Sequence, residues 1–405
     1  MEKKQTNRKG LVFLITALLF AAQFIGNYGD FQLAAIPARI YEAFQLNDMQ
    51  FSSLMTAPMI PSIFLSIVIG LLVDRFGIPK IVGIWLILAA VGFTLRCFAE
   101  SYTVMLIAMA ISGAGCMIVN ANLAKMASAL YPMDKVSKVV GILMGSANAA
   151  TALSFATTAF FSSLKLAFWI PAIAAILNAV LWIVFAREDL FSAAVAQEEE
   201  KVSIRESLSL CLKSRSLWLA GMTQFLVLGS SMVITNFHVS ALTTLQGYTE
   251  AAAGSFNSVL MIGAIVGSVL LPVYVTKKPE RAPLIVLIML VISALTCYGM
   301  VTLPAWGIYI CSFLNGALRS GVIATMLLAP VLLKEIGPRN AGTAGGVIIT
   351  LQLLGAVILP TYIIVPLGGG DLQRYFLLAS VFMLLSAAVA FTFMKTCGAF
   401  GKKKD

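Results

Sequence analysis

Two charged residues stand inside long apolar stretches of the sequence, where an ionic group is costly. Asp30 lies in the first of these stretches, and Arg319 lies near the centre of the tenth. Asn27 precedes Asp30 by three residues and Asn315 precedes Arg319 by four, so each amide shares a helix face with its charged neighbour. A guanidinium beside an amide can bind a carboxylate or a similar anion, because the planar fork of arginine matches that geometry.

Each of the two charges has a functional and a structural interpretation. Arg319 can bind an anionic ligand, or it can pair with Asp30 or with a backbone carbonyl group. Asp30 can take up and release a proton, because removal from water disfavours the ionised carboxylate. Alternatively, Asp30 remains the ionised partner of Arg39 or Arg319. An internal ion pair that opens when the ligand binds would combine the two roles.

The composition explains why the apolar stretches are so long. Of the 405 residues, 60% are hydrophobic and 11% are charged, and the mean hydropathy is +0.93. A soluble domain carries about a quarter charged residues, and one aqueous core could not bury this much apolar surface. The sequence therefore predicts a protein dissolved in a lipid bilayer, and it excludes a soluble enzyme, a disordered chain and a disulfide-stabilised secreted domain.

The apolar stretches predict an all-α membrane protein with twelve transmembrane helices. A helix needs about 20 apolar residues to cross the hydrocarbon core. The twelve stretches cover residues 11–38, 50–73, 80–99, 102–126, 136–161, 164–186, 216–241, 252–276, 282–303, 305–333, 341–366 and 372–395. We therefore expect an N-terminal six-helix bundle over 1–186, a linker loop over 187–215 and a C-terminal six-helix bundle over 216–405.

The distribution of positive charge predicts the orientation of the chain. Most of the 28 Lys and Arg residues fall in the termini and in loops on one side of the predicted spans. Cytoplasmic loops are rich in Lys and Arg, so both termini are expected in the cytoplasm. The same loops account for the net charge of +10, so this charge does not indicate a nucleic acid partner, and we expect none. The basic N-terminus could begin a signal peptide, but the long apolar run that follows it favours a retained helix.

Other polar residues inside the predicted spans are weaker candidates. His238 can titrate near neutral pH, so it is a second proton-coupling candidate beside Asp30, with hydrogen bonding as its structural alternative. Asn236 lies roughly 200° round the same helix, and only one of the two can face a binding site. Arg96 is expected to reach the membrane interface or to pair locally near Glu100. The full predicted substrate-binding set is Arg319, Asn315, Asn27, Asn120, Asn148 and Asn236.

The loop between the second and third spans reads GLLVDRFGIPK from Gly70 to Lys80. Gly70 allows a neighbouring helix to approach closely, and Gly77 permits a tight turn. Asp74 can cap a helix or pair with a cation. Arg75 and Lys80 can anchor the loop at the membrane interface. The pattern resembles the signature loop of the major facilitator superfamily, G-x-x-x-D-R/K-x-G-x-x-R/K, and implies a gating role for these five residues.

The resemblance implies two pseudo-repeated six-helix bundles in which spans 1, 4, 7 and 10 line a central cavity. Asp30 and Arg319 lie on two of these spans, so the resemblance places both near the path of the transported molecule. The matching segment of the second half, residues 272–281, keeps its basic positions but has Thr276 and Pro279 in place of the carboxylate and the glycine. This second copy of the motif is degenerate.

The expected function is secondary active transport of a small carboxylate-type organic anion across the cytoplasmic membrane by alternating access. Proton symport or anion exchange would supply the energy, and the chain is loosely similar to the anion-carrying branches of the superfamily. The alternative is a proton-driven exporter of drugs or cations with Asp30 as the counter-charge, which the central Arg319 disfavours. A membrane sensor is a third reading, although the linker is too short for an output domain.

The sequence predicts no cofactor and no enzymatic activity. The six cysteines are scattered and the single histidine makes a metal site improbable. No Gly-Lys-Ser/Thr phosphate loop and no nucleophile–base pair are present, so ATP is not the direct energy source. The expected partners are an anionic small molecule, a coupling proton or counter-anion, and the lipid bilayer, with the protein as a monomer.

Overall fold

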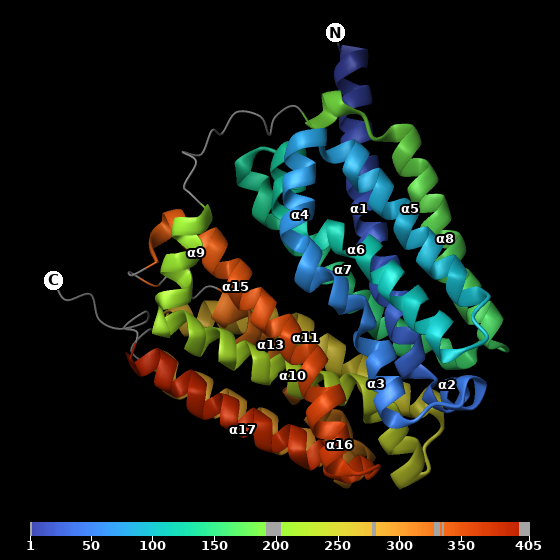
Figure 1. Cartoon of the computed structure of the whole chain (residues 1–405), viewed down its shortest axis with the longest axis vertical. Helices are drawn as coiled ribbons and strands as arrows, with labels where there is room; N and C mark the ends of the chain where they lie inside the picture. The colour runs from blue at the N-terminus through green and yellow to red at the C-terminus, as the bar shows by residue number, and fades with distance from the viewer. Residues whose placement is uncertain (1, 192–203, 278–280, 328–332, 334–335, 397–405) are drawn as a thin grey trace. The chain divides into compact units, whose positions relative to one another are not determined.

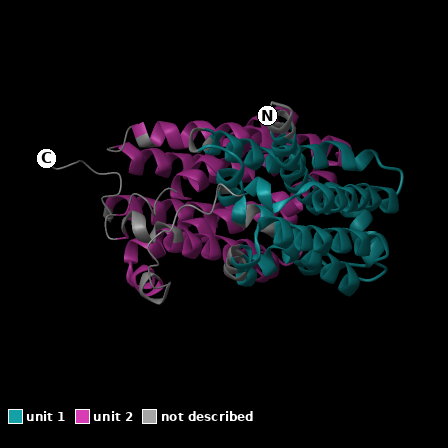
Figure 2. Ribbon diagram, turned by 90° about the horizontal axis from the view of Figure 1, so that it is seen from above, with its two compact units in different colours: residues 1–199 teal, residues 200–405 magenta. Residues whose placement is uncertain are grey.

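The computed structural model describes residues 2–191, 204–277, 281–327, 333 and 336–396, and these residues form helices without any β-strand. The predicted all-α class is confirmed. The chain divides into two compact units, residues 1–199 and residues 200–405, coloured separately in Figure 2. The division falls within the polar segment that follows the sixth predicted span.

Unit 1 holds the first six predicted spans. Within it, α1 packs against α6, α7 and α8, and α5 packs against α6 and α8 (Figure 1). Its helices are α1 (Glu2–Ala35), α2 (Pro37–Phe44), α3 (Asp48–Thr56), α4 (Ile60–Phe76), α5 (Ile78–Cys97), α6 (Tyr102–Leu130), α7 (Met133–Thr157) and α8 (Leu164–Phe185).

Unit 2 holds the last six predicted spans and one short helix before them. Within it, α10 packs against α15 and α17, and α13 packs against α11 and α12. Its helices are α9 (Ile204–Lys213), α10 (Arg215–Gln246), α11 (Glu250–Lys277), α12 (Ala282–Thr302), α13 (Ala305–Leu327), α15 (Gly337–Ile358), a π-helical segment η5 (Leu359–Ile364), α16 (Val365–Gly368) and α17 (Leu372–Thr396).

Proline explains where the helices depart from the predicted spans. The first span ends at Ala35, because Pro37 starts the separate helix α2. The second predicted span is divided among α3, a 3₁₀ turn at Ala57–Met59 and α4, with Pro58 inside the turn. Pro360 lies in the π-helical segment that interrupts the eleventh span. Each break leaves the overall path of the span in place.

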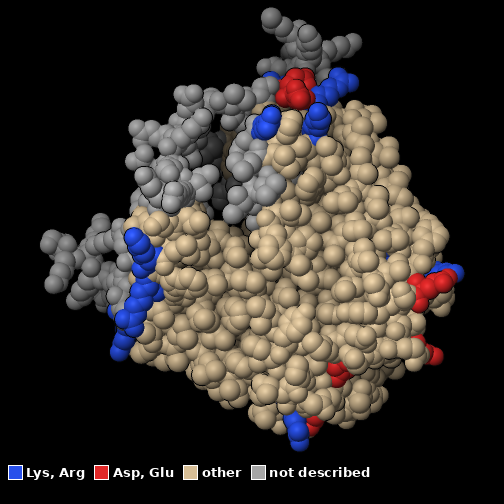
Figure 3. All heavy atoms as spheres, in the orientation of Figure 1, with Lys and Arg blue, Asp and Glu red and all other residues tan. Residues whose placement is uncertain are grey.

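The helices have the length and surface of membrane spans. Among the described residues, ten helices are long and apolar enough to cross a bilayer, and Tyr102–Met117 forms a shorter apolar stretch. Large apolar side chains are exposed along them, for example Leu177 at 56% and Val184 at 57% on α8. On the face drawn in Figure 3, charged side chains lie at the margins and the broad area between them carries none. Such a surface requires lipid as its solvent.

Glycine residues allow neighbouring helices to approach within backbone contact. A Cβ atom on Gly115 of α6 would lie 2.2 Å from the backbone nitrogen of Ala89 on α5. In unit 2, a Cβ atom on Gly267 of α11 would lie 1.9 Å from the carbonyl oxygen of Ala317 on α13. Small residues at such contacts are how membrane helices pack without a hydrophobic driving force between them.

Gly115→Ala should therefore destabilise unit 1, because the added methyl group meets backbone atoms that cannot move aside. We expect a loss of about 1–3 kcal/mol, the usual cost of overpacking, seen as a lower melting temperature of the purified protein in detergent. Gly145→Ala is the matched control, since nothing lies within 4 Å of a Cβ atom at that position. Equal melting temperatures for the two variants would contradict this description of the α5–α6 contact.

Candidate functional site

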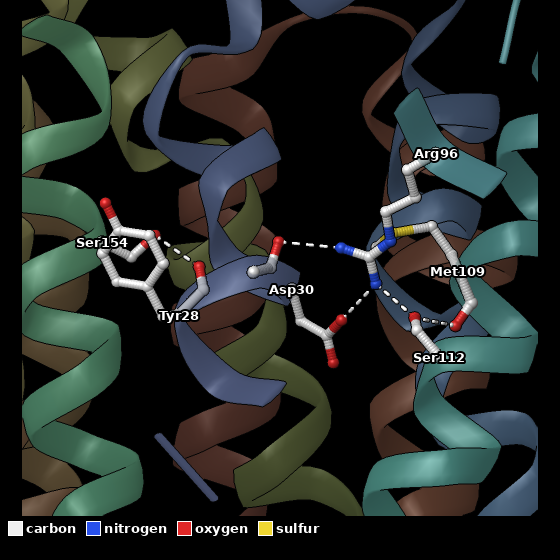
Figure 4. A network of polar contacts seen from close by, with 7 residues as sticks. Tyr28, Asp30, Arg96, Met109, Ser112 and Ser154 are labelled. Atoms are coloured by element: carbon white, nitrogen blue, oxygen red, sulfur yellow. Dashed lines mark hydrogen bonds and ion pairs between the residues drawn. The ribbon is translucent and has the colours of Figure 1, made fainter. Parts of the chain in front are cut away.

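Asp30 forms an ion pair with Arg96, a residue that the sequence did not single out as a partner. The Nη2 atom of Arg96 on α5 lies 2.5 Å from the Oδ1 atom of Asp30 on α1. The Arg96 side chain is 1% exposed and the Asp30 side chain 19% exposed. The sequence predicted a pairing of Arg96 near Glu100 or with the membrane interface, and this was wrong because the guanidinium points into the helix bundle (Figure 4).

The guanidinium of Arg96 is held from several sides at once (Figure 4). Its Nη1 atom donates to the carbonyl oxygen of Gly29 at 2.9 Å, and its Nη2 atom also donates to the hydroxyl of Ser112 on α6. The Ser112 hydroxyl donates in turn to the carbonyl oxygen of Met109 at 3.0 Å. The guanidinium lies 4.4 Å from the centre of the Phe93 ring, a favourable cation–π distance. The network thus joins α1, α5 and α6.

Small residues make this network possible. A Cβ atom on Gly29 would lie 2.3 Å from the ring of Phe93, so only glycine leaves room for that ring beside α1. A Cβ atom on Gly92 would lie 2.3 Å from the backbone nitrogen of Ser112, so glycine also brings α6 within reach of Arg96. The close contacts of the helix backbones therefore set the positions of the three polar side chains.

The ion pair leaves part of Asp30 available for chemistry. Its second carboxylate oxygen forms no hydrogen bond with a described residue, and the side chain keeps its 19% exposure. A carboxylate that is half engaged by a cation and half accessible can accept a proton. Protonation would remove its charge and weaken its attraction to Arg96, which would leave a buried cation without compensation. Proton binding at Asp30 would therefore act directly on a buried ion pair.

In unit 2, Arg319 is buried without a partner among the residues that the structure describes. The residue is 5% exposed, and it forms no ion pair and no hydrogen bond with any described residue; its Nε atom is among the buried polar atoms without a partner. Asn315, on the same face of α13, donates from Nδ2 to the carbonyl oxygen of Ser293 on α12 at 2.8 Å. The Oδ1 atom of Asn315 is unpaired, and so are the hydroxyls of Ser293 and Ser312.

The two remaining candidates of unit 2, Asn236 and His238, both lie on α10 and differ in their contacts. Asn236 is fully buried, and neither atom of its amide group has a partner among the described residues. His238 is also fully buried, but its Nδ1 atom lies 2.8 Å from Oδ1 of Asn257 on α11 and its Nε2 atom 3.3 Å from the carbonyl oxygen of Met300 on α12. These contacts match the hydrogen-bonding alternative for His238.

The other predicted amides are less distinctive. Asn27 is half-buried beside Asp30 on α1 and donates from Nδ2 to the carbonyl oxygen of Gln23 at 2.9 Å. Asn148 is half-buried on α7. The side chain of Asn120 on α6 lies outside the described part of the structure.

The signature loop forms the turn between α4 and α5. Gly77 has a φ of 85°, a conformation that glycine favours, and it ends α4 and precedes α5. Arg75 and Lys80 are exposed and lie 5.2 Å and 5.8 Å from the ring centre of Phe76. The surroundings of Gly70 and Asp74 lie outside the described part of the structure.

The sequence pattern alone did not identify Arg96, Ser112 and Gly29 as one site. Arg96 lies within two residues of the end of α5, where a long cationic side chain ordinarily extends to water. The available signal was the pair of glycines, Gly29 and Gly92, since close helix contacts bring interior polar groups together.

Comparison with known protein families decides the classification. The family model described as Major Facilitator Superfamily matches residues 12–360. The chain belongs to this superfamily. It is accordingly a multi-pass membrane transporter with the superfamily's twelve-helix fold, as the signature loop and the two units indicated.

Solved structures of the same fold agree with this assignment. A bacterial homologue of the human lysosomal transporter Spinster, crystallised in an inward-facing and unoccupied conformation, has a TM-score of 0.79 at 15% identity, with 98% of this chain and 99% of that chain covered. A mutant of the nucleoside transporter NupG has a TM-score of 0.72 at 15% identity, with 96% and 100% covered. A search of curated proteins finds no match. At this identity the similarity shows the fold alone.

Arg96→Met should strongly destabilise the transporter, because it leaves Asp30 without the cation that compensates its charge. Breaking a buried pair costs about 3–5 kcal/mol, and the partial exposure of Asp30 places the expected loss at the lower end of that range. The double variant Arg96→Met, Asp30→Asn should recover most of the lost melting temperature. Additive losses in the double variant would show that the two side chains do not form a coupled pair.

Proposed function

We propose that this transporter carries a small organic anion of carboxylate type across the cytoplasmic membrane. The observation that supports this most directly is the buried, unpartnered guanidinium of Arg319. A cation held away from water without a counter-charge is unfavourable, and an incoming carboxylate would supply that counter-charge. Arginine would bind it through two parallel hydrogen bonds.

The unpaired polar atoms near Arg319 in the sequence of α13 support the same proposal. Ser312, Asn315 and Arg319 follow one another at spacings of three and four residues, so they share a helix face. The bond from Asn315 to Ser293 shows that α12 meets this face. Buried polar atoms are nearly always satisfied, so the unpaired hydroxyls and amide oxygen favour a ligand with hydrogen-bonding groups beside its carboxylate. Asn236, Asn27, Asn120 and Asn148 complete the proposed binding set.

We place proton coupling at Asp30. The carboxylate is partly accessible and its charge is balanced by Arg96, so proton binding at Asp30 alters a buried ion pair. Symport of the anion with a proton, or exchange for another anion, would drive transport. The hydrogen bonds of His238 favour a packing role for that residue over its alternative role in coupling.

Alternating access would use the two bundles, 1–186 and 216–405, as the moving bodies, with 187–215 as their linker. The superfamily assignment supports this mechanism, since its two halves rock about a site near the middle of the membrane. The signature residues Gly70, Asp74, Arg75, Gly77 and Lys80 would control the gate. We also propose that both termini lie in the cytoplasm and that the monomer is the working form.

The contacts of Asp30 weigh against the alternative of drug or cation export. A cation would need a free carboxylate as its counter-charge, and Asp30 already has Arg96. The unpaired Arg319 would repel a cation. The nucleoside carried by NupG has no bearing on the cargo here, because 15% identity supports the fold only.

Arg319→Gln should abolish most anion uptake while leaving the protein folded. Loss of charge-assisted hydrogen bonds of ~1.5–3 kcal/mol corresponds to roughly a 10- to 150-fold weaker apparent affinity. The melting temperature should stay equal or rise, because an uncompensated buried cation is removed. Uptake of labelled carboxylates into proteoliposomes tests this, with Arg374→Gln as the control, since Arg374 is 67% exposed and paired with Asp371. Wild-type uptake by Arg319→Gln would refute the anion site.

Asp30→Asn should uncouple transport from the proton gradient. The amide cannot accept the proton, so we expect loss of concentrative uptake driven by ΔpH, while exchange of labelled for unlabelled anion at equal pH continues. Asp371→Asn, at an exposed acid on unit 2, is the control. Accumulation against a gradient in the Asp30→Asn protein would show that the proton is carried elsewhere.

A further inference from the structure

A groove of about 510 Å³ runs between α5 and α8 on unit 1. It is separate from the Asp30–Arg96 network, and all of its lining residues are described. Its volume lies in the range of about 300–1,000 Å³ that is usual for small-molecule sites. Figure 1 shows the two helices side by side, and they pack directly against each other. The groove therefore belongs to unit 1 alone.

The walls of the groove are apolar and its rims are exposed. Its lining is apolar except for the hydroxyl of Thr94. The rims carry Ile87 and Val91 from α5, Phe98 from the turn directly after it, and Ile176, Val180 and Ile183 from α8, all 40–64% exposed. The small residues Ala90 and Ala179 are buried at 7% and 4% exposure and form the floor. An apolar molecule that lies in the bilayer can enter from the side without crossing water.

The length of the groove matches one leaflet. From Ile87 to its end at Cys97 the α5 helix advances by about 15 Å at 1.5 Å per residue. The hydrocarbon core is about 30 Å thick, so the groove covers roughly half of it. On the α5 side it ends at Phe98, directly after the helix, whereas its α8 lining runs from Ile176 to Ile183. A lipid acyl chain anchored at that surface has the same extent and direction.

Beyond the Phe98 end of the groove, the first turn of α8 carries a positive charge. Counting back along α8 from Ile176 in helical steps leads through Trp169 to Lys165, on the same face of the helix. Trp169 packs edge-on against Phe98 at 5.7 Å between ring centres. Lys165 is exposed and forms no ion pair with a described residue. Arg96, the nearby cation on α5, is already committed to Asp30.

We propose that this groove binds an anionic phospholipid of the leaflet into which Lys165 projects. One acyl chain lies between α5 and α8, the Phe98–Trp169 pair lies at the level of the glycerol backbone, and Lys165 contacts the phosphate-bearing headgroup. Aromatic residues favour this depth in the membrane, and a lysine near the surface attracts anionic lipid. The site is independent of the cargo and of its proton coupling.

Lipid retention by the purified full-length protein tests the proposal. The protein is exchanged with phosphatidylglycerol and phosphatidylcholine of identical chains, and bound lipid is counted by native mass spectrometry. Wild type should prefer phosphatidylglycerol by about fivefold, the effect of one lysine near a membrane surface. Lys165→Gln should bring this ratio close to one, while Lys138→Gln, at an exposed lysine on α7, should keep it. A headgroup preference that survives Lys165→Gln would overturn the assignment of the headgroup.

Substitutions in the groove itself test the binding of the acyl chain. Thr94→Trp fills the groove and should abolish retention of both lipids, whereas Leu181→Trp, at an exposed position on another face of α8, should retain them as wild type does. The melting temperature in detergent confirms that each variant is folded. Equal retention by Thr94→Trp and wild type would show that the chain binds elsewhere and would overturn the site. Transport results for Arg319 variants have no influence on either outcome.

Discussion

Holding a charge away from water is costly, and the buried arginines of the two units differ in how this cost is compensated. In unit 1 the guanidinium of Arg96 is compensated by Asp30, a backbone carbonyl and a hydroxyl, with an aromatic ring beside it. In unit 2 the guanidinium of Arg319 has no hydrogen-bond or ion-pair partner among the described residues. A buried charge with a partner costs far less than one without, and the anion that we propose for Arg319 would supply its counter-charge.

The helix contacts make the compensated arrangement possible. Gly29 and Gly92 bring α1 and α6 close enough to α5 for one side chain to reach both. In lipid, such contacts are held by close packing and interhelical hydrogen bonds rather than by exclusion of water. The polar network and the glycine contacts therefore depend on each other: the glycines position the charges, and the charges hold together the three helices that the glycines allow to meet.

The sequence predicted the spans and the family well, and the site only in part. Apolar length and a signature loop are local properties, so helices appeared where they were expected, with shifts at Pro37, Pro58 and Pro360. The placement of Arg319 and Asn315 on one helix face could be predicted from their spacing, and their role in binding stays a prediction. The direction of the Arg96 side chain could not be predicted. A cation near a helix end ordinarily extends to water, and the true direction of this one depends on how α1, α5 and α6 pack. The structural alternative for Asp30 named Arg39 or Arg319 as its cation, and this was wrong for the same reason, since the partner is Arg96.

The engagement of Asp30 by Arg96 also constrains how proton and cargo can be coupled. An ion pair between Asp30 and Arg319 would have linked the two sites directly, since an anion could displace the carboxylate. With Asp30 paired to Arg96 inside unit 1, the proton and the anion of the proposed mechanism would act on different groups in different units. Coupling then has to pass through the conformational equilibrium, with each ligand binding one state more tightly than the other. A shift from mostly one state to mostly the other needs a differential affinity of about 10⁴, and two ligands that each supply about 10² reach it only together.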